Sequence, residues 1–250
     1  MFRVRQVYDI CTAFGIPITA DITSLGLLLL LVLDFGLQLG LPCAVLLALS
    51  IVLHELAHSL TSRAFGCRIS EIRLSILGGC ASGEIPHAAW KEFLMAAAGP
   101  AMSFCLGFGL LFAFGGVRIE SDWLRNVIQY AIVMNIILGA FNLLPGFPMD
   151  GGRLFRCVMR FFVSRAKATY YAMIVGRIAA VALVLLPLLG VYNIWIIPIG
   201  GSIFFRGLIA WMIWREGMRE YQLALREEDF RNWTQADFNA RVSPPPYERN

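Results

Sequence analysis

The stretch Leu41–Leu60 reads LPCAVLLALSIVLHELAHSL and carries the pattern His54-Glu55-Leu56-Ala57-His58 near the end of an apolar run. A run of this length predicts a helix that crosses a membrane, which needs about 20 mostly apolar residues. Positions i and i+4 share one helix face, so both imidazoles can bind one divalent ion while Glu55 projects beside them. The alternative is that neighbouring helices satisfy the two histidines, which would leave several costly buried groups to be paired separately.

The composition of the whole chain is that of a polytopic membrane protein. Of its 250 residues, 58% are hydrophobic and only 15% are charged, and the mean hydropathy is +0.68. These values are too apolar for a soluble domain. The net charge of +4 is not gathered in one patch, which argues against a nucleic-acid partner. The six cysteines lack ligand spacing, so we expect reduced thiols.

Six apolar segments are long enough to span a bilayer, which predicts an all-α polytopic membrane protein with about six transmembrane helices. We place them at 22–38, 41–62, 92–116, 123–142, 172–190 and 193–213. Between the second and third, Arg68–Ser82 has apolar residues among polar ones and ends in glycines. This segment predicts a small β element at the membrane edge.

Basic residues predict the orientation. With both termini in the cytoplasm, 17 of the 21 basic residues lie inside, as the positive-inside rule requires. We therefore expect an integral protein of the prokaryotic cell (inner) membrane, surrounded by the lipid bilayer. Residues 1–213 would form the embedded core, and residues 214–250 a cytoplasmic tail that begins as a helix and ends disordered. Nothing in the sequence indicates an oligomeric state.

A second unusual stretch offers a third metal ligand. Asn142–Arg153 reads NLLPGFPMDGGR, in which Pro145 and Pro148 break the fourth apolar helix and two glycines permit irregular backbone at Asp150. Unwound backbone at membrane depth is tolerated where protein buries it or where it lines a wet cavity. Asp150 and the two histidines are both expected near the cytoplasmic side, so they can meet.

The two motifs together resemble the site-2 protease family of intramembrane zinc metalloproteases. An HExxH helix is followed about ninety residues later by Asn-x-x-Pro-x-x-Pro-x-Asp-Gly-Gly, in apolar surroundings. The resemblance implies one Zn²⁺ per chain on His54, His58 and Asp150, with Glu55 as general base. It also implies that Asn142 positions the substrate or polarises its carbonyl.

Other parts of the chain fit the same family. Gly78-Gly79 look like its glycine pair in a re-entrant element, and Glu92 with Ala98–Ala101 look like its third-span signature. Ser103 stands where relatives often carry Asn. The loop at 116–123 is too short for a PDZ domain, and the 37 residues from Trp214 are too few for paired CBS domains. We therefore expect a minimal, core-only member.

The resemblance implies regulated intramembrane proteolysis of a single-span membrane protein, cut near the cytoplasmic side of its span. We expect an edge strand with Ile72 and Leu74, together with Gly78 and Gly79, to bind the unwound substrate by strand addition. One alternative is a catalytically inactive relative that acts as a membrane binding partner. Another is a metal or solute transporter, which would show matching interruptions in two halves of the chain.

Overall fold

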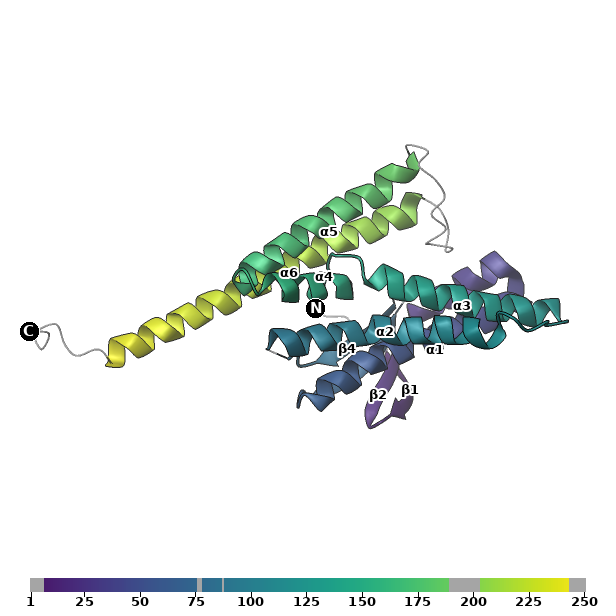
Figure 1. Cartoon of the computed structure of the whole chain (residues 1–250), viewed down its shortest axis with the longest axis horizontal. Helices are drawn as coiled ribbons and strands as arrows, with labels where there is room; N and C mark the ends of the chain where they lie inside the picture. Colours follow the sequence, from purple (N-terminus) through teal and green to yellow (C-terminus); the bar gives the residue numbers. More distant parts are fainter. Residues whose placement is uncertain (1–6, 76–77, 87, 189–202, 243–250) are drawn as a thin grey trace, which may run out of the picture.

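The computed structural model describes residues 7–75, 78–86, 88–188 and 203–242, and its helices fall into two groups (Figure 1). The first group packs side by side and comprises α1 (Ser24–Ala64), α2 (Ala89–Phe114) and α3 (Asp122–Asn142). The second is the pair α5 (Arg165–Leu188) and α6 (Ile203–Val242). The short α4 (Asp150–Met159) packs against both α2 and α5, so it joins the two groups.

Helix α1 contains a sharp break. Gly36 has φ 74°, a left-handed conformation that L side chains rarely adopt. Four residues later, a Cβ on Gly40 would lie 2.4 Å from the carbonyl oxygen of Leu31. Because residues nine apart in a straight helix would be about 13 Å apart, the chain must fold back here. The expected spans 22–38 and 41–62 are therefore the two arms of one broken element.

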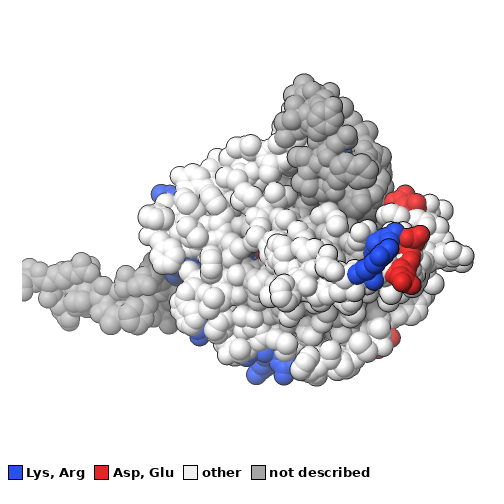
Figure 2. All heavy atoms as spheres, turned by 45° about the vertical axis from the view of Figure 1, so that its right-hand side comes forward, with Lys and Arg blue, Asp and Glu red and all other residues white. Residues whose placement is uncertain are grey.

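The membrane character is supported, but six spans are not confirmed. Within the described ranges, four helices are long and apolar enough to cross a membrane: Leu31–Ala64, Ala89–Phe114, Asp122–Asn142 and Arg165–Leu185. The expected sixth span, 193–213, falls partly in 189–202, outside the described residues. On the face shown in Figure 2, charged side chains are few and lie mainly toward the edges. Such a surface is typical of protein that faces lipid.

A four-stranded sheet accompanies the helices. The order is β1 (Val7–Ala13), β2 (Ile16–Asp21), β3 (Ile69–Ser75) and β4 (Gly78–Gly83). The pair β3–β4 confirms the β element expected in 68–82. The N-terminal hairpin β1–β2 was not predicted, and its second strand pairs in parallel with β3. The β element is thus larger than the one expected between the second and third spans.

The register of β3 corrects the expected role of Ile72 and Leu74. Ile72 is opposite Ile18 of β2, and Leu74 is opposite Gly79 of β4, so both sides of β3 are paired. Both side chains are also buried in the core. Strand β3 therefore has no free edge for a substrate, and the strand that ends the sheet on this side is β4.

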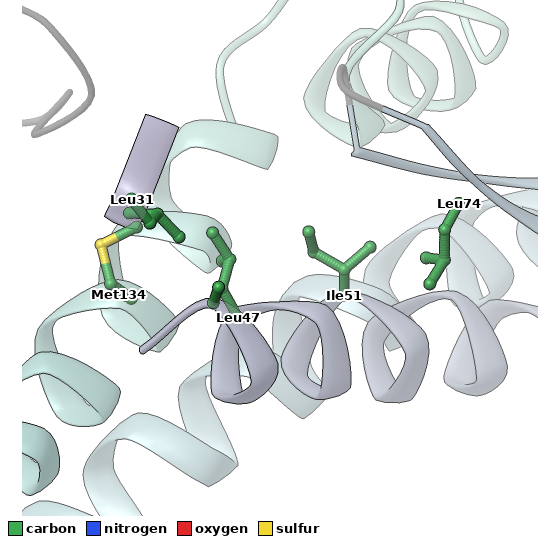
Figure 3. Close-up of a cluster of buried hydrophobic side chains, with 6 residues drawn as sticks. Leu31, Leu47, Ile51, Leu74 and Met134 are labelled. Carbon is green, nitrogen blue, oxygen red and sulfur yellow. The ribbon is translucent and has the colours of Figure 1, made fainter. Parts of the chain in front are cut away.

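The core holds the histidine-bearing part of α1 in place. One buried cluster joins Leu31, Leu47 and Ile51 of α1 to Leu74 of the sheet and Met134 of α3 (Figure 3). A second cluster packs α1 directly on the sheet and consists of Leu56, Ile16, Ile18 and Ile72. The first cluster precedes the HExxH turn along α1, and the second includes Leu56 within it, so the turn itself packs on the sheet and the preceding part of α1 packs on α3.

Candidate metal centre

Three side chains from two distant segments converge at one point. His54 Nε2 and His58 Nε2 of α1 lie 3.2 Å apart, and Asp150 Oδ2 lies 3.2 Å and 3.1 Å from them. All three side chains are buried. Tetrahedral zinc with bonds of about 2.0–2.2 Å separates neighbouring ligand atoms by roughly 3.3–3.5 Å. The observed spacing therefore fits a single ion held by all three residues.

The other nitrogen of each imidazole has its own partner. His58 Nδ1 lies 2.7 Å from the carbonyl oxygen of Met95, and His54 Nδ1 lies 2.9 Å from Ser103 Oγ. A carbonyl only accepts, so His58 carries its proton on Nδ1 and presents the Nε2 lone pair to the centre. Metal-bound histidines are commonly oriented in this way. Helix α2 thus satisfies one nitrogen of each ring and leaves the other for an ion.

Helix α2 is shaped to accept the two imidazoles. A Cβ on Gly99 would lie 2.1 Å from His58 Nε2 and 2.6 Å from His54 Nε2, so only glycine allows this approach. Gly99 was expected only as part of the third-span signature and Ser103 only as a departure from it, so their contacts with the histidines were not predicted. Met95, Gly99 and Ser103 are spaced four residues apart, which is the signal that could have placed them on one helix face.

Glu55 lies where α1 meets β4. A Cβ on Gly79 would lie 2.5 Å from Glu55 Cγ, so the backbone of β4 packs directly against this side chain. Gly78 begins the strand with φ 115°. The structure therefore brings Gly79 to Glu55, with Gly78 beside it in β4, whereas Ile72 and Leu74 are buried in the core.

Asn142 and Asp150 bracket the break between α3 and α4. Asn142 is the last residue of α3, and its Nδ2 donates to the carbonyl oxygen of Leu138 at 2.9 Å. Asp150 begins α4, where the helix N-terminus favours a negative charge. A Cβ on Gly151 would lie 2.2 Å from the carbonyl oxygen of Leu143, so the glycine lets α4 fold tightly onto the preceding loop.

Comparisons with known proteins match the part of the chain that contains His54, His58 and Asp150. The sequence profile of peptidase family M50 matches residues 42–120 and 117–186. A zinc metalloprotease of Methanocaldococcus jannaschii is 34% identical over 200 residues, which are 76% of this chain and 56% of that protein. The chain thus spans little more than half the length of this relative.

A solved structure agrees with the sequence relatives. A site-2 protease from Methanocaldococcus jannaschii has a TM-score of 0.60 and 29% identity, covering 86% of this chain and 95% of that one. The family expected from the two motifs is therefore confirmed. This chain belongs to peptidase family M50, the family of the site-2 proteases.

Proposed function

We propose that this chain is an intramembrane zinc metalloprotease that hydrolyses peptide bonds within the transmembrane segments of other proteins. The observation that carries this proposal is the convergence of His54, His58 and Asp150, with ligand atoms within 4.8 Å of one another, among helices able to cross a membrane. Two imidazoles and a carboxylate form a typical catalytic zinc site, which leaves one position open. The zinc metalloprotease and site-2 protease relatives support the same activity.

Each polar residue has one role in this proposal. Zinc at His54, His58 and Asp150 would polarise a water molecule and the scissile carbonyl. Glu55 accepts a proton from the attacking water and returns it to the leaving nitrogen. Asn142 holds the substrate or donates a hydrogen bond to the carbonyl oxygen as negative charge develops there.

We assign substrate capture to strand β4. It ends the sheet, and its Gly79 packs against Glu55. An unwound substrate that adds to this edge would place its carbonyl groups beside Glu55 and the metal ligands. Gly78 and Gly79 remain in this role, while Ile72 and Leu74 support the strand from the core.

We place both termini in the cytoplasm of a prokaryotic cell, with residues 1–213 in the inner membrane and 214–250 as the tail. The distribution of the 21 basic residues supports this orientation. Helix α6 continues from Ile203 to Val242, so the tail begins as an extension of a core helix. A reporter fused after Asn250 should be active only in a cytoplasmic assay, and activity on the opposite side would overturn the orientation.

The substrate in this proposal is a single-span membrane protein, cut near the cytoplasmic end of its span. Helical hydrogen bonds shield the carbonyl groups, so the span must unwind before attack. The test reconstitutes the chain with two substrates, one carrying Gly or Pro near the cut and one with a Leu-only span. We expect faster cleavage of the first, mapped by mass spectrometry to within the span. Cuts confined to water-exposed loops, or equal rates, would overturn the proposal.

The two alternatives are less favoured. An inactive relative could lose Glu55 or Asp150, yet both are present. A transporter would show matching interruptions in two halves of the chain, and the expected spans 172–190 and 193–213 contain no second HExxH-like or Pro-x-x-Pro-x-Asp segment. In the described part of the chain, His54, His58 and Asp150 form the single group of three or more His, Cys, Asp or Glu residues suited to a metal ion.

A further inference from the structure

A second buried polar cluster lies between α2, α4 and α6, and the proposed chemistry does not use it. Arg156 of α4 donates to Glu92 Oε1 of α2 from Nε at 3.1 Å and from Nη2, and to Glu220 Oε2 of α6 from Nη1 at 3.0 Å. Arg160 Nη1 donates to Glu92 Oε2 at 3.1 Å. Glu92 is 0% and Arg156 is 1% exposed. Two guanidinium groups balance two carboxylates, so this cluster needs no added ion.

Arg156 also contacts the loop that leads to Asp150. Its guanidinium lies 5.0 Å from the centroid of the Phe147 ring, and Phe147 is fully buried. Phe147 precedes Asp150 by three residues. The Arg156 side chain therefore connects α4 to α2 and α6 and also contacts the loop that leads into α4.

Helix α2 carries the contacts of both clusters. Glu92 binds Arg156, and Gly99 lies against the two imidazoles. At 1.5 Å per residue, Glu92 and Gly99 are separated by about 10.5 Å along α2. Arg156 and Asp150 are separated by about 9 Å along α4, which packs on α2. The two lengths are similar and both ends are joined, Glu92 to Arg156 and Gly99 to the imidazoles that contact Asp150. Seating Arg156 on Glu92 therefore holds Asp150 near the histidines.

We propose that Arg156 is a positioning residue for the metal centre: held by Glu92 and Glu220, it sets the register in which α4 delivers Asp150 to His54 and His58. This inference rests on the proposed function, in which Asp150 is a zinc ligand. A slip of α4 by one turn would move Asp150 by about 5.4 Å. A misplacement of about 1 Å can already lower a catalytic rate about 10²-fold.

The chemistry of the cluster is better suited to fixing the position of α4 than to stabilising the fold. Desolvation offsets much of the attraction between buried ions, so apolar replacement of a whole pair is often neutral or stabilising. The planar guanidinium fork, by contrast, fixes the direction of its hydrogen bonds, which a lysine ammonium cannot do. Folding and positioning can therefore be separated by the choice of variant.

The experiment uses the full chain in liposomes with two variants and a control. Arg156→Lys keeps the charge and loses the fork, and Glu92→Leu/Arg156→Met removes both partners of the buried pair. The control, Arg165→Met, removes a 3.1 Å ion pair to Glu227 of α6 that involves neither α2 nor α4. Zinc affinity is measured by competition with a chelator, kcat and KM with a single-span substrate, and folding by thermal unfolding.

We expect both variants to fold, to bind zinc about 10- to 100-fold more weakly, and to lose at least about 10-fold in kcat. KM should stay within about threefold, because the cluster does not touch the substrate. The control should match the wild type. Variants with wild-type zinc affinity and kcat would overturn the positioning role, whatever their unfolding midpoint.

Failure of the double variant to fold and failure of the proposed function itself can each be distinguished from failure of the positioning role. If the double variant does not fold, Arg156→Lys decides the question by the same zinc and kcat measurements. A wild-type chain that neither binds zinc nor cleaves would instead overturn the proposed function, and the positioning role with it.

Discussion

The molecule has two buried polar clusters, and they differ in whether their charged and hydrogen-bonding groups all find partners within the cluster. In the ion cluster, Glu92 and Arg156 satisfy each other, with Arg160 and Glu220 as further partners. At the metal centre, the Nε2 atoms of His54 and His58 and a carboxylate oxygen of Asp150 point at one another. The Nδ1 atom of each imidazole already has a partner on α2. Burying such groups is costly unless a cation joins them. An incomplete cluster therefore indicates a bound ligand, and a complete one indicates a structural or positioning role.

The largest expected effect separates the metal ligands from the base. His54→Ala and Asp150→Ala should lose zinc and cleavage together, because three ligands hold the ion. Glu55→Gln should retain zinc while cleavage falls about 10²- to 10⁴-fold, because the general base is lost. Metal analysis and a cleavage assay on the same preparations measure both. Full zinc occupancy in His54→Ala, or activity in Asp150→Ala, would contradict the assignment of ligands.

A smaller effect on zinc affinity is expected for a substitution at Gly99, where α2 lies against the metal centre. The Cβ of Gly99→Ala would overlap both imidazoles, so zinc binding should weaken about 10- to 100-fold for an overpacking cost of about 1–3 kcal/mol. The matched control is Gly109→Ala in the same helix, where an added Cβ meets nothing within 4 Å. Chelator competition measures both. Equal zinc affinity in the two variants would show that α2 is not fitted to the metal centre.

The hydrogen bond from Ser103 to His54 should matter less than a ligand. Ser103→Ala removes the partner of His54 Nδ1, and we expect zinc affinity to fall about 10-fold. Ser103→Asn supplies another acceptor at the position and should recover part of the loss. Zinc titration of the wild type and the two variants is the measurement. An unchanged affinity in Ser103→Ala would show that the hydroxyl does not support zinc binding.

The smallest effect is expected for an ion pair that is not buried. Arg125 and Asp122 pair at the start of α3, with side chains 47% and 79% exposed. Such pairs contribute about 0.2–1 kcal/mol. Arg125→Gln should therefore leave zinc affinity and kcat unchanged and shift the unfolding midpoint only slightly. A loss comparable to that of Arg156→Lys would contradict the distinction between buried and exposed pairs.

Several features could be read from the sequence because they depend on neighbours along the chain. His54 and His58 share a face by helical periodicity, and Asp150 follows a break that prolines impose. The pair β3–β4 follows from polar and apolar residues before a glycine pair. Each of these inferences needed fewer than about twenty consecutive residues.

Other features could not be found in this way because their partners are far apart. Strand β2 pairs with β3 through Ile18 and Ile72, two residues that are far apart in the sequence. The same register made β3 an interior strand, which overturned its expected role as a substrate-binding edge. The reversal of α1 was expected, since the spans 22–38 and 41–62 meet there, but its position at Gly36 was not, because glycine is compatible with both a helix and a turn.

From the amino-acid order alone came the membrane setting, the metal-binding residue types and the family, because composition, helical spacing and motif order are local or linear properties. The tertiary structure alone placed Ser103 and Met95 behind the histidines, Gly79 against Glu55, and Arg156 between Glu92 and Glu220. These contacts join helices and strands that are distant in sequence. They arise only when those elements pack, so no single segment of the chain encodes them.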